Sequence, residues 1–450
     1  MEQNSAQLGG METTGRFLVL MQQDAVKEGV SALTDGFGLK AVASAADFQD
    51  GAVDAKTLAS EKAIVFPELG VAVVDVPPDQ YQQLGAMVAD DNSIMIVEPE
   101  RQVHLYESST AVGAPYASGP SGAMAQEYLL GYRDAVNHLV DRMTGTNGNG
   151  ASASALAPAA TPAFADTSAL TWGLQATRAA ESRFTGQGVN VAVLDTGFDL
   201  GHPDFVGRPV TSRSFIQGED VQDEHGHGTH CIGTALGPRV PNTLPRYGVA
   251  FNARVFAGKV LSNAGSGSDG GILAGINWAI SNRCAVISMS LGAETQPGQT
   301  FSRIYEEVAR RALAAGTLIV AAAGNESERP MLVNPVGHPA NCPSILSVGA
   351  LDSQLRIARF SNGGINPQGG QVDIAAPGVA VRSSWKRPLT YRTISGTSMA
   401  TPHVAGIAAL LIEANSAMVG GSLGWLLLQS SRRLDLAARD VGAGLVQAPV

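Results

Sequence analysis

Five continuous apolar runs in the second half of the chain constrain its fold more than any other feature. The runs are "VNVAVLDTG", "ARVFAGKVL", "CAVISMSLG", "TLIVAAAGN" and "SILSVGAL", and segments of helical pattern separate them. A strand without polar alternation is buried on both faces, which is typical of a parallel sheet covered by helices. Residues 168–450 are therefore predicted to form an α/β domain with a parallel sheet flanked by helices.

The first part of the chain has a shorter, mixed pattern. Residues 15–107 alternate strand-like and helix-like segments in the order β-α-β-β-α-β, ending in "SIMIVEPERQVHLY". This order predicts a small α+β domain of the split-βαβ type. Residues 1–14 are predicted to be a disordered tail. Residues 108–167 are predicted to be a linker of small residues that contains one amphipathic helix at 123–143.

Composition excludes several classes of partner. The net charge is -10 and no basic cluster occurs, so nucleic acid is not an expected partner. No apolar run reaches the roughly 18 residues of a membrane span, so a membrane is not expected either. The start of the sequence has no basic segment followed by an apolar one, and no secretory signal is visible. We expect a monomer that is cytoplasmic or exported without such a signal, unless a signal was removed beforehand.

Polar residues at the ends of the predicted parallel strands mark the expected site. In an open parallel sheet, residues just past the strand ends face the ligand crevice. Asp195, Ser290 and Asn325 hold such positions. Ser398 lies in "ISGTSMATPHVAG", at a junction between a loop and a helix, where a hydroxyl is exposed near the positive end of the helix dipole. With a nearby imidazole, these groups supply a nucleophile, a base, an orienting carboxylate and an oxyanion donor.

The three histidines of "DEHGHGTHCIGT" indicate either a metal site or a catalytic base. A zinc site would need all of them to converge on one point. His225 and His227 are two positions apart, so on a helix they would point to different sides. Base catalysis is therefore favoured over metal binding. The neighbouring Cys231 is either an inert buried thiol or a reactive thiol close to the base.

Seven motifs in the second half resemble those of the subtilisin-like serine proteases, in the same order. They are "VAVLDTGFDLGHPDF", "HGHGTHCIGTALG", "SMSLG", "AAAGNE", "AAPG", "SGTSMATPHVAG" and "GAGLVQA". The resemblance implies a serine endopeptidase in which Asp195, His227 and Ser398 form the catalytic triad and Asn325 is the oxyanion donor. In the motif His-Gly-Thr-His the first histidine is the base, and His230 then supports it structurally.

The resemblance also places the substrate cleft. Residues 263–271 match one substrate-binding edge and residues 290–292 the opposing edge, so a polypeptide substrate is expected to add as a strand between them. A glycine floor in the S1 pocket leaves room for a large apolar or aromatic P1 side chain, and Glu326 at the rim could admit a basic one. The expected substrate-binding residues are Gly265, Ser266, Gly267, Ser290, Leu291, Gly292, Gly324 and Gly337.

Residues 15–107 resemble the propeptide of this family, which implies an intramolecular chaperone and inhibitor in a zymogen that cuts itself. The last strand would enter the cleft like a substrate, with the aromatic Tyr106 at P1. The first cut is therefore predicted between Tyr106 and Glu107. The alternative is that residues 1–150 form the propeptide, with the first new terminus at or beyond Ala151.

No cofactor is expected to be required. The segment "GPRVPNTLPRYGVA" stands where the family has a calcium loop, but it is longer and lacks the Asn-rich spacing of that loop. Calcium is therefore not expected there, although Asp204 remains a candidate ligand. Asp373 is a candidate for a second, weaker cation site.

Two proteins of other classes would share parts of this pattern. A cofactor-binding oxidoreductase would use Gly265, Gly267 and Gly270, which spell GxGxxG, but the next strand lacks the acidic residue that should follow. A catalytically silent pseudoprotease would bind peptides in the same cleft. The presence of all four catalytic residue types favours the enzyme over this alternative.

Overall fold

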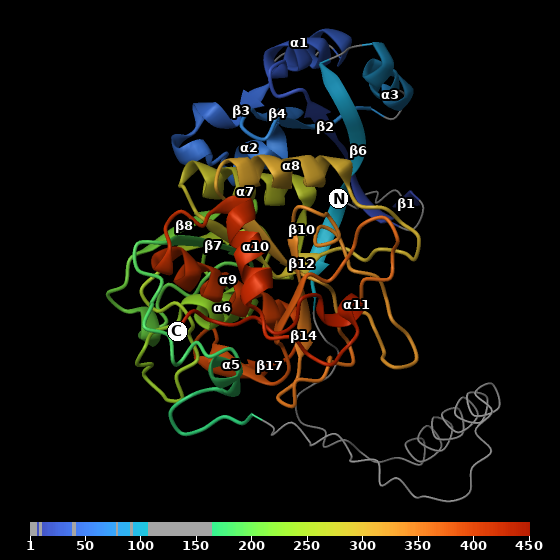
Figure 1. Ribbon diagram of the computed structural model, residues 1–450. Helices are drawn as coiled ribbons and strands as arrows, with labels where there is room; N and C mark the ends of the chain where they lie inside the picture. The colour runs from blue at the N-terminus through green and yellow to red at the C-terminus, as the bar shows by residue number, and fades with distance from the viewer. Residues whose placement is uncertain (1–6, 9–10, 38–41, 78–79, 91–92, 107–163) are drawn as a thin grey trace, which may run out of the picture. The chain divides into compact units, whose positions relative to one another are not determined.

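In the computed structural model, which describes residues 7–8, 11–37, 42–77, 80–90, 93–106 and 164–450, the apolar runs form a seven-stranded sheet (Figure 1). Its order is β15-β14-β13-β11-β7-β9-β8, and every neighbouring pair is parallel. The strands are β7 (Asn190–Asp195), β8 (Val210–Ser214), β9 (Arg254–Lys259), β11 (Val286–Met289), β13 (Leu318–Ala322), β14 (Leu346–Leu351) and β15 (Ile374–Pro377).

Helices cover both faces of this sheet, which confirms the predicted architecture. Side chains alternate along β7, so that Val191 and Val193 pack into one apolar core while Ala192 and Leu194 pack into another. The first core contains α6 (His227–Leu236), α9 (Thr397–Ala414) and α10 (Gly420–Ser430), and the second α7 (Asp269–Ser281) and α8 (Arg303–Ala314). Smaller elements are α5 (Trp172–Ala176), η4 (Pro203–Phe205), β16 (Val381–Ser384), β17 (Tyr391–Ile394) and α11 (Ala438–Val441).

The N-terminal region forms a second, largely antiparallel sheet in the order β6-β2-β5-β4-β3. Its main elements follow the order β-α-β-β-α-β: β2 (Met11–Met21), α1 (Val26–Phe37), β4 (Ala63–Phe66), β5 (Val71–Val74), α3 (Tyr81–Asp90) and β6 (Ile94–Leu105). Short additions are β1 (Gln7–Leu8), β3 (Ala43–Ser44), η1 (Ala45–Asp47), η2 (Gln49–Gly51) and α2 (Ala55–Ser60).

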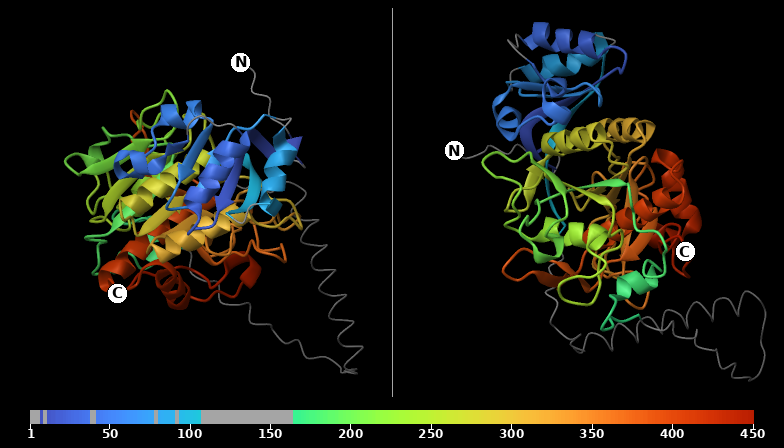
Figure 2. Two further views of the ribbon diagram at one scale, coloured as in Figure 1. Left: turned by 90° about the horizontal axis from the view of Figure 1, so that it is seen from above. Right: turned by 90° about the vertical axis from the view of Figure 1, so that its left-hand side faces the viewer.

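This second sheet is covered by its own helices on one face only. Val19 and Met21 pack with apolar residues of α1 and α3. Leu18 and Leu20 point the other way and share a core with α7 and α8. Both views agree that α7 and α8 lie between the two sheets (Figures 1 and 2). The N-terminal region therefore depends on the C-terminal region to bury one face of its sheet.

The last strand of the N-terminal region runs on into the C-terminal region. In β6, Gln102, Val103 and His104 pair antiparallel with β10 (Ser266–Ser268). Leu105 and His104 pair antiparallel with β12 (Leu291–Gly292) on the other side. The end of β6 is thus held as a middle strand between two segments of the C-terminal region.

The prediction that residues 1–14 form a disordered tail is wrong for the residues described there. β1 pairs with β2, and Thr13 of β2 lies opposite Arg101 of β6. The hydroxyl of Thr14 donates to the Glu100 carboxylate. This end of β2 carries threonines instead of apolar residues, so the sequence pattern did not indicate a strand. Polar contacts with β6, which lies far along the chain, hold it in place.

Part of the predicted linker and its helix cannot be compared with the structure. The helix at 123–143 and Glu107 lie outside the described residues. Of the linker, only its final residues are described, and there Phe164 N–H donates to the Ser353 carbonyl (2.8 Å). Phe164, which the prediction assigned to the linker, therefore packs against the C-terminal region.

Candidate active site

The carboxyl edge of the parallel sheet brings the predicted site residues together. Asp195 is the last residue of β7, and Asn325 follows the end of β13. His227 and Ser398 lie in the first turns of α6 and α9. The carbonyl of Tyr106, the residue after β6, contacts Asn325 and Ser398, and the side chains of Asp195, His227 and Ser398 are buried. A carboxylate, an imidazole and a hydroxyl are thus shielded from solvent near the end of β6.

Asp195 and His227 form a hydrogen-bonded pair. His227 Nδ1 lies 2.8 Å from Asp195 Oδ1, which also accepts the Thr196 N–H (2.7 Å). Within the described part of the chain, His227 Nε2 has no hydrogen-bond partner. With Nδ1 bonded to the carboxylate, Nε2 is the nitrogen that remains to accept a proton.

The beginning of α6 is fixed by Asp223, a residue that sequence reasoning missed. Its Oδ1 accepts the N–H of Gly226 (2.7 Å), and its Oδ2 accepts the N–H and hydroxyl of Thr229 (2.9 and 2.7 Å). These bonds satisfy donors at the helix start that have no partner within the helix. An acidic residue just before a helix is a capping signal, so the spacing of Asp223 could have revealed this role.

Burial and charge act in opposite directions on His227. Burial disfavours the charged imidazole, but the Asp195 carboxylate outweighs it and holds the pKa of His227 well above its ordinary value. The deeper His230 has no such partner; burial lowers its pKa to about 3, and its Nε2 lies 3.1 Å from the Val381 carbonyl oxygen. His230 is therefore a neutral structural residue beside a titrating one.

The carbonyl oxygen of Tyr106 lies between Asn325 and Ser398. Asn325 Nδ2 donates to it at 2.7 Å, and Ser398 Oγ lies 3.4 Å from it. Ser398 Oγ also lies 3.3 Å from the carbonyl oxygen of Ser290, whose own hydroxyl donates to the Ser398 carbonyl (2.9 Å). Ser290, predicted to bind substrate, thus contacts the serine of the site rather than β6.

Thr397 orients the Asn325 amide, a role that sequence reasoning missed. Asn325 Oδ1 accepts both the N–H and the hydroxyl of Thr397, each at 2.9 Å. With the oxygen so occupied, the NH₂ group must face Tyr106. The same threonine hydroxyl accepts the Gly324 N–H (3.2 Å). Gly324, predicted to contact substrate, therefore bonds to Thr397 in this structure.

The predicted cleft edges hold β6 as an added strand. Ser266 pairs with His104, Leu291 with Leu105, and the Leu105 N–H donates to the Gly265 carbonyl (3.0 Å). Gly265 has a φ of +80°. Such a backbone strains any residue with a side chain, which explains glycine at this edge.

The side chain of Tyr106 fills a pocket that ends in backbone. Its hydroxyl lies 3.3 Å from the carbonyl oxygens of both Ala293 and His338. A Cβ added at Gly292 or Gly337 would lie 2.2 or 2.0 Å from this hydroxyl, so only glycine leaves room for the ring. Burial, aided by the negative charges of Glu326 and Glu294, raises the pKa of Tyr106 well above its usual value. The phenol therefore stays protonated and can donate to the two carbonyls.

The metal alternative fails on geometry. Among the described residues, the cluster whose ligand atoms lie within reach of one ion is Asp195, His227 and Cys231, without His225 or His230. Cys231 Sγ lies 3.7 Å from His227 Nδ1, and burial raises the pKa of this thiol to about 11. The three histidines therefore do not converge on one point, and a fully buried thiol with a raised pKa reacts slowly.

The two candidate cation ligands, Asp204 and Asp373, both accept hydrogen bonds from groups of the protein. Asp204 Oδ2 accepts the hydroxyl of Tyr247 (2.6 Å), and Oδ1 accepts the hydroxyl of Tyr391 (2.9 Å) and the N–H of Asn242 (2.5 Å). These donors already satisfy the carboxylate. Asp373 is half-buried, and desolvation raises the pKa of its carboxyl to about 6 while it accepts the N–H of Ser347 (2.8 Å). Each of these two candidate cation ligands thus has a hydrogen-bond donor of the protein as its partner in this structure.

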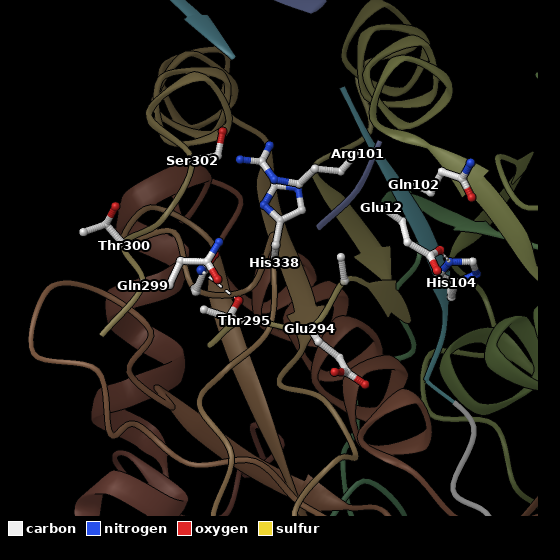
Figure 3. Close-up of a pocket in the computed structure, with 12 residues that line it drawn as sticks. Glu12, Arg101, Gln102, His104, Glu294, Thr295, Gln299, Thr300, Ser302 and His338 are labelled. Atoms are coloured by element: carbon white, nitrogen blue, oxygen red, sulfur yellow. Dashed lines mark hydrogen bonds and ion pairs between the residues drawn. The ribbon is translucent and has the colours of Figure 1, made fainter. Parts of the chain in front are cut away.

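A further cavity of about 270 Å³ lies beside β6, between the two regions (Figure 3). Its walls include Arg101 of β6 together with Glu294 and His338 of the C-terminal region. His338 Nε2 lies 3.0 Å from Asp269 Oδ1, and Arg101 contacts the other oxygen of the same carboxylate. Sequence reasoning did not single out Arg101, Glu294 or His338.

Residues 186–444, more than half of the chain, match the subtilase family. The chain therefore belongs to the subtilase family. Subtilisin E of Bacillus subtilis (strain 168) is 40% identical over 259 residues, which is 58% of this chain and 62% of that protein. Subtilisin of Bacillus pumilus is 39% identical over 260 residues, 58% of this chain and 87% of that protein.

A solved structure gives the same result for the fold. The crystal structure of a cold adapted subtilisin-like serine proteinase is similar with a TM-score of 0.50 and 33% identity, covering 60% of this chain and 92% of that one. The match to subtilisin E spans less than two thirds of its length. In the part of the chain that is described, no helix combines the length and apolarity needed to cross a membrane.

Proposed function

We propose that this subtilase is a serine endopeptidase made as a self-processing zymogen, with Asp195, His227 and Ser398 as its catalytic triad. The observation that carries the proposal is the position of the Tyr106 carbonyl oxygen, 2.7 Å from Asn325 Nδ2 and 3.4 Å from Ser398 Oγ. A backbone carbonyl between a hydroxyl and a fixed amide donor has the arrangement expected of a scissile bond.

In the proposed reaction, Ser398 Oγ forms a bond to the carbonyl carbon while its proton moves to His227 Nε2. Asp195 keeps the imidazole in the required tautomer through Nδ1, at 2.8 Å. The negative charge that develops on the carbonyl oxygen is stabilised by the Asn325 amide and the Ser398 backbone N–H. The carbon–nitrogen bond then breaks, the amine leaves with the proton from Nε2, and water hydrolyses the acyl-enzyme by the same route.

The proposed substrates are polypeptides with a large aromatic residue at P1. The pocket around Tyr106 supports this preference because its far end consists of two glycines and two carbonyl oxygens. The paired edges β10 and β12 supply main-chain hydrogen bonds, which bind extended peptides whatever their sequence. Residues 15–107 act in this proposal as the protein's own inhibitor, and the first cut falls between Tyr106 and Glu107.

A peptide-binding protein without catalysis is the alternative. It would keep the cleft but would not need the buried Asp195–His227 pair, with Nδ1 and Oδ1 2.8 Å apart, beside an amide donor that binds a backbone carbonyl. Together these groups are the ones that acyl transfer requires. The enzyme is therefore favoured.

The test follows the full-length chain by intact mass and N-terminal sequencing after purification. We expect wild type to yield a first new terminus at Glu107, to cleave peptides with tyrosine at P1, and to react with a fluorophosphonate. Ser398→Ala should remain full length, uncut and unlabelled. Ser416→Ala, which removes an exposed hydroxyl just after α9, should behave as wild type.

Two results would count against the proposal. Cleavage by purified Ser398→Ala would show that another residue is the nucleophile. A first terminus at or beyond Ala151 would leave the triad intact but would show that Tyr106–Glu107 is not the first bond cut.

A further inference from the structure

Arg101 of β6 is bound by a carboxylate of the C-terminal region, well beyond the pocket that holds Tyr106. With Tyr106 at P1, counting back along β6 places Arg101 at P6. The Arg101 backbone N–H donates to Asp269 Oδ2 at 3.0 Å, and its Nη1 lies 3.3 Å from the same oxygen. One carboxylate oxygen thus binds both the main chain and the side chain of the P6 residue.

The position of the Asp269 carboxylate is set by the C-terminal region alone. Its other oxygen lies 3.0 Å from His338 Nε2. The His338 ring packs edge-on against Tyr305, with ring centroids 4.6 Å apart, and the Tyr305 hydroxyl donates to the Asp269 carbonyl (3.0 Å). Asp269 is fully buried at the start of α7. These contacts of Asp269 lie within the C-terminal region and do not depend on β6. The second carboxylate oxygen, Oδ2, faces the strand.

The other acidic partner of Arg101 belongs to β6 itself. Glu98 Oε2 lies 3.1 Å from Arg101 Nη2 and also accepts the Ser302 hydroxyl (2.6 Å). When another peptide takes the place of β6, this glutamate leaves with it. Among the ion pairs described for Arg101, the one with Asp269 is the one that a different peptide would meet again.

We infer that Asp269 forms a subsite that selects arginine at P6 of the substrate. Any peptide that adds as a strand between β10 and β12 brings its P6 residue to the start of α7, because the main-chain pairing fixes the register. A guanidinium there gains a charge-assisted hydrogen bond to a carboxylate that is largely removed from water. A neutral side chain of the same shape leaves that oxygen without its charged partner. This inference rests on the proposed endopeptidase function.

The experiment uses two peptides that reach from P6 to the primed side and carry tyrosine at P1. They differ only at P6, where one has arginine and the other has citrulline, a neutral group of nearly the same shape. The P6 residue takes the position of Arg101, which Figure 3 shows. The protein is expressed as the full chain and assayed once its peptidase activity has appeared. We expect kcat/KM to favour arginine by about tenfold or more, as for a hydrogen bond between charged groups.

The matched variants are Asp269→Asn, which keeps the shape and removes the charge, and Asp435→Asn, which removes an exposed charge elsewhere. The ratio between the two peptides should fall to about one in Asp269→Asn and stay unchanged in Asp435→Asn. If Asp269→Asn does not fold, the wild-type ratio decides alone, and a ratio near one overturns the subsite. A preference for arginine that persists in Asp269→Asn overturns it as well. If neither peptide is cut by wild type, the endopeptidase proposal itself fails.

Discussion

The described part of the chain contains two buried histidine–aspartate pairs, and the pKa values of their histidines shift in opposite directions. His227 Nδ1 lies 2.8 Å from Asp195, and His338 Nε2 lies 3.0 Å from Asp269. In each pair burial disfavours the charged imidazole and the carboxylate favours it. Yet the pKa of His227 is raised well above its ordinary value, whereas the pKa of His338 is lowered.

The two pairs also differ in their further neighbours. At His338 burial is the largest cause of the lowered pKa, and the Arg101 guanidinium at the second oxygen of Asp269 adds to it. At His227 the effect of burial is opposed by Asp195 and also by the neighbouring Cys231. A histidine–aspartate pair therefore does not by itself raise the pKa of its imidazole, because burial and the other neighbours contribute as well.

The largest expected effect comes from removing the carboxylate of the first pair. Asp195→Asn should lower kcat by about 10⁴-fold, the size known for the same change in other serine protease triads. The amide can stabilise neither the required tautomer of His227 nor its positive charge in the transition state. Steady-state kinetics against a peptide with tyrosine at P1 would measure this, with Asp435→Asn as the control. A loss below tenfold would mean that Asp195 does not orient the base.

A second prediction concerns pH. Only neutral His227 can accept the serine proton, and its pKa is raised, so the rise of kcat/KM with pH should have its midpoint above about 6.5, the ordinary histidine value. The contribution of the charged pair to the free energy of unfolding changes with pH in the opposite direction to kcat/KM. The charged pair contributes stability that is fully present below the pKa of the unfolded state and is lost as pH rises through the folded pKa. A kcat/KM profile with its midpoint below about 6 would show that Asp195 does not raise the pKa of His227.

The smallest expected effect is a change in the second pair alone. Arg101→Gln in the uncut Ser398→Ala chain should raise the pKa of His338, because a neighbouring positive charge is removed while burial and Asp269 remain. The pKa of His227 should not change. Proton NMR of the histidine rings across a pH titration would follow both in one sample. Equal shifts at the two histidines would show that the substitution disturbs the whole structure rather than one pair.

The sequence predicted the parts of the site that lie within motifs. Asp195, Asn325 and Ser398 were found because strand ends and a helix start place polar groups at one edge of a parallel sheet. The structure places them there, and it places Tyr106 at the end of β6 beside them. These positions are local properties of the chain, so strand and helix patterns are enough to predict them.

Contacts between distant segments could not be predicted in this way. Asp269 lies within a segment expected to bind substrate, yet its partner Arg101 is 168 positions away, and nothing in either segment specifies the other. Asp204 was only a candidate cation ligand, in a region where the family has a calcium loop. Its actual partners, Tyr247 and Tyr391, come from different parts of the chain. In both cases the fold, and not the local pattern, decides what a carboxylate contacts.

The apolar face that the N-terminal sheet shares with α7 and α8 has a consequence for activation. Before any cut, covalent connection keeps that face at a high effective concentration next to the helices. If the proposed zymogen cuts itself behind Tyr106, the same contact becomes an equilibrium between two separate molecules, governed by a dissociation constant. The active fraction should then depend on how dilute the protein is. In a concentrated solution the cleaved N-terminal region would stay bound and the peptidase would be inhibited, whereas dilution alone would release the active peptidase.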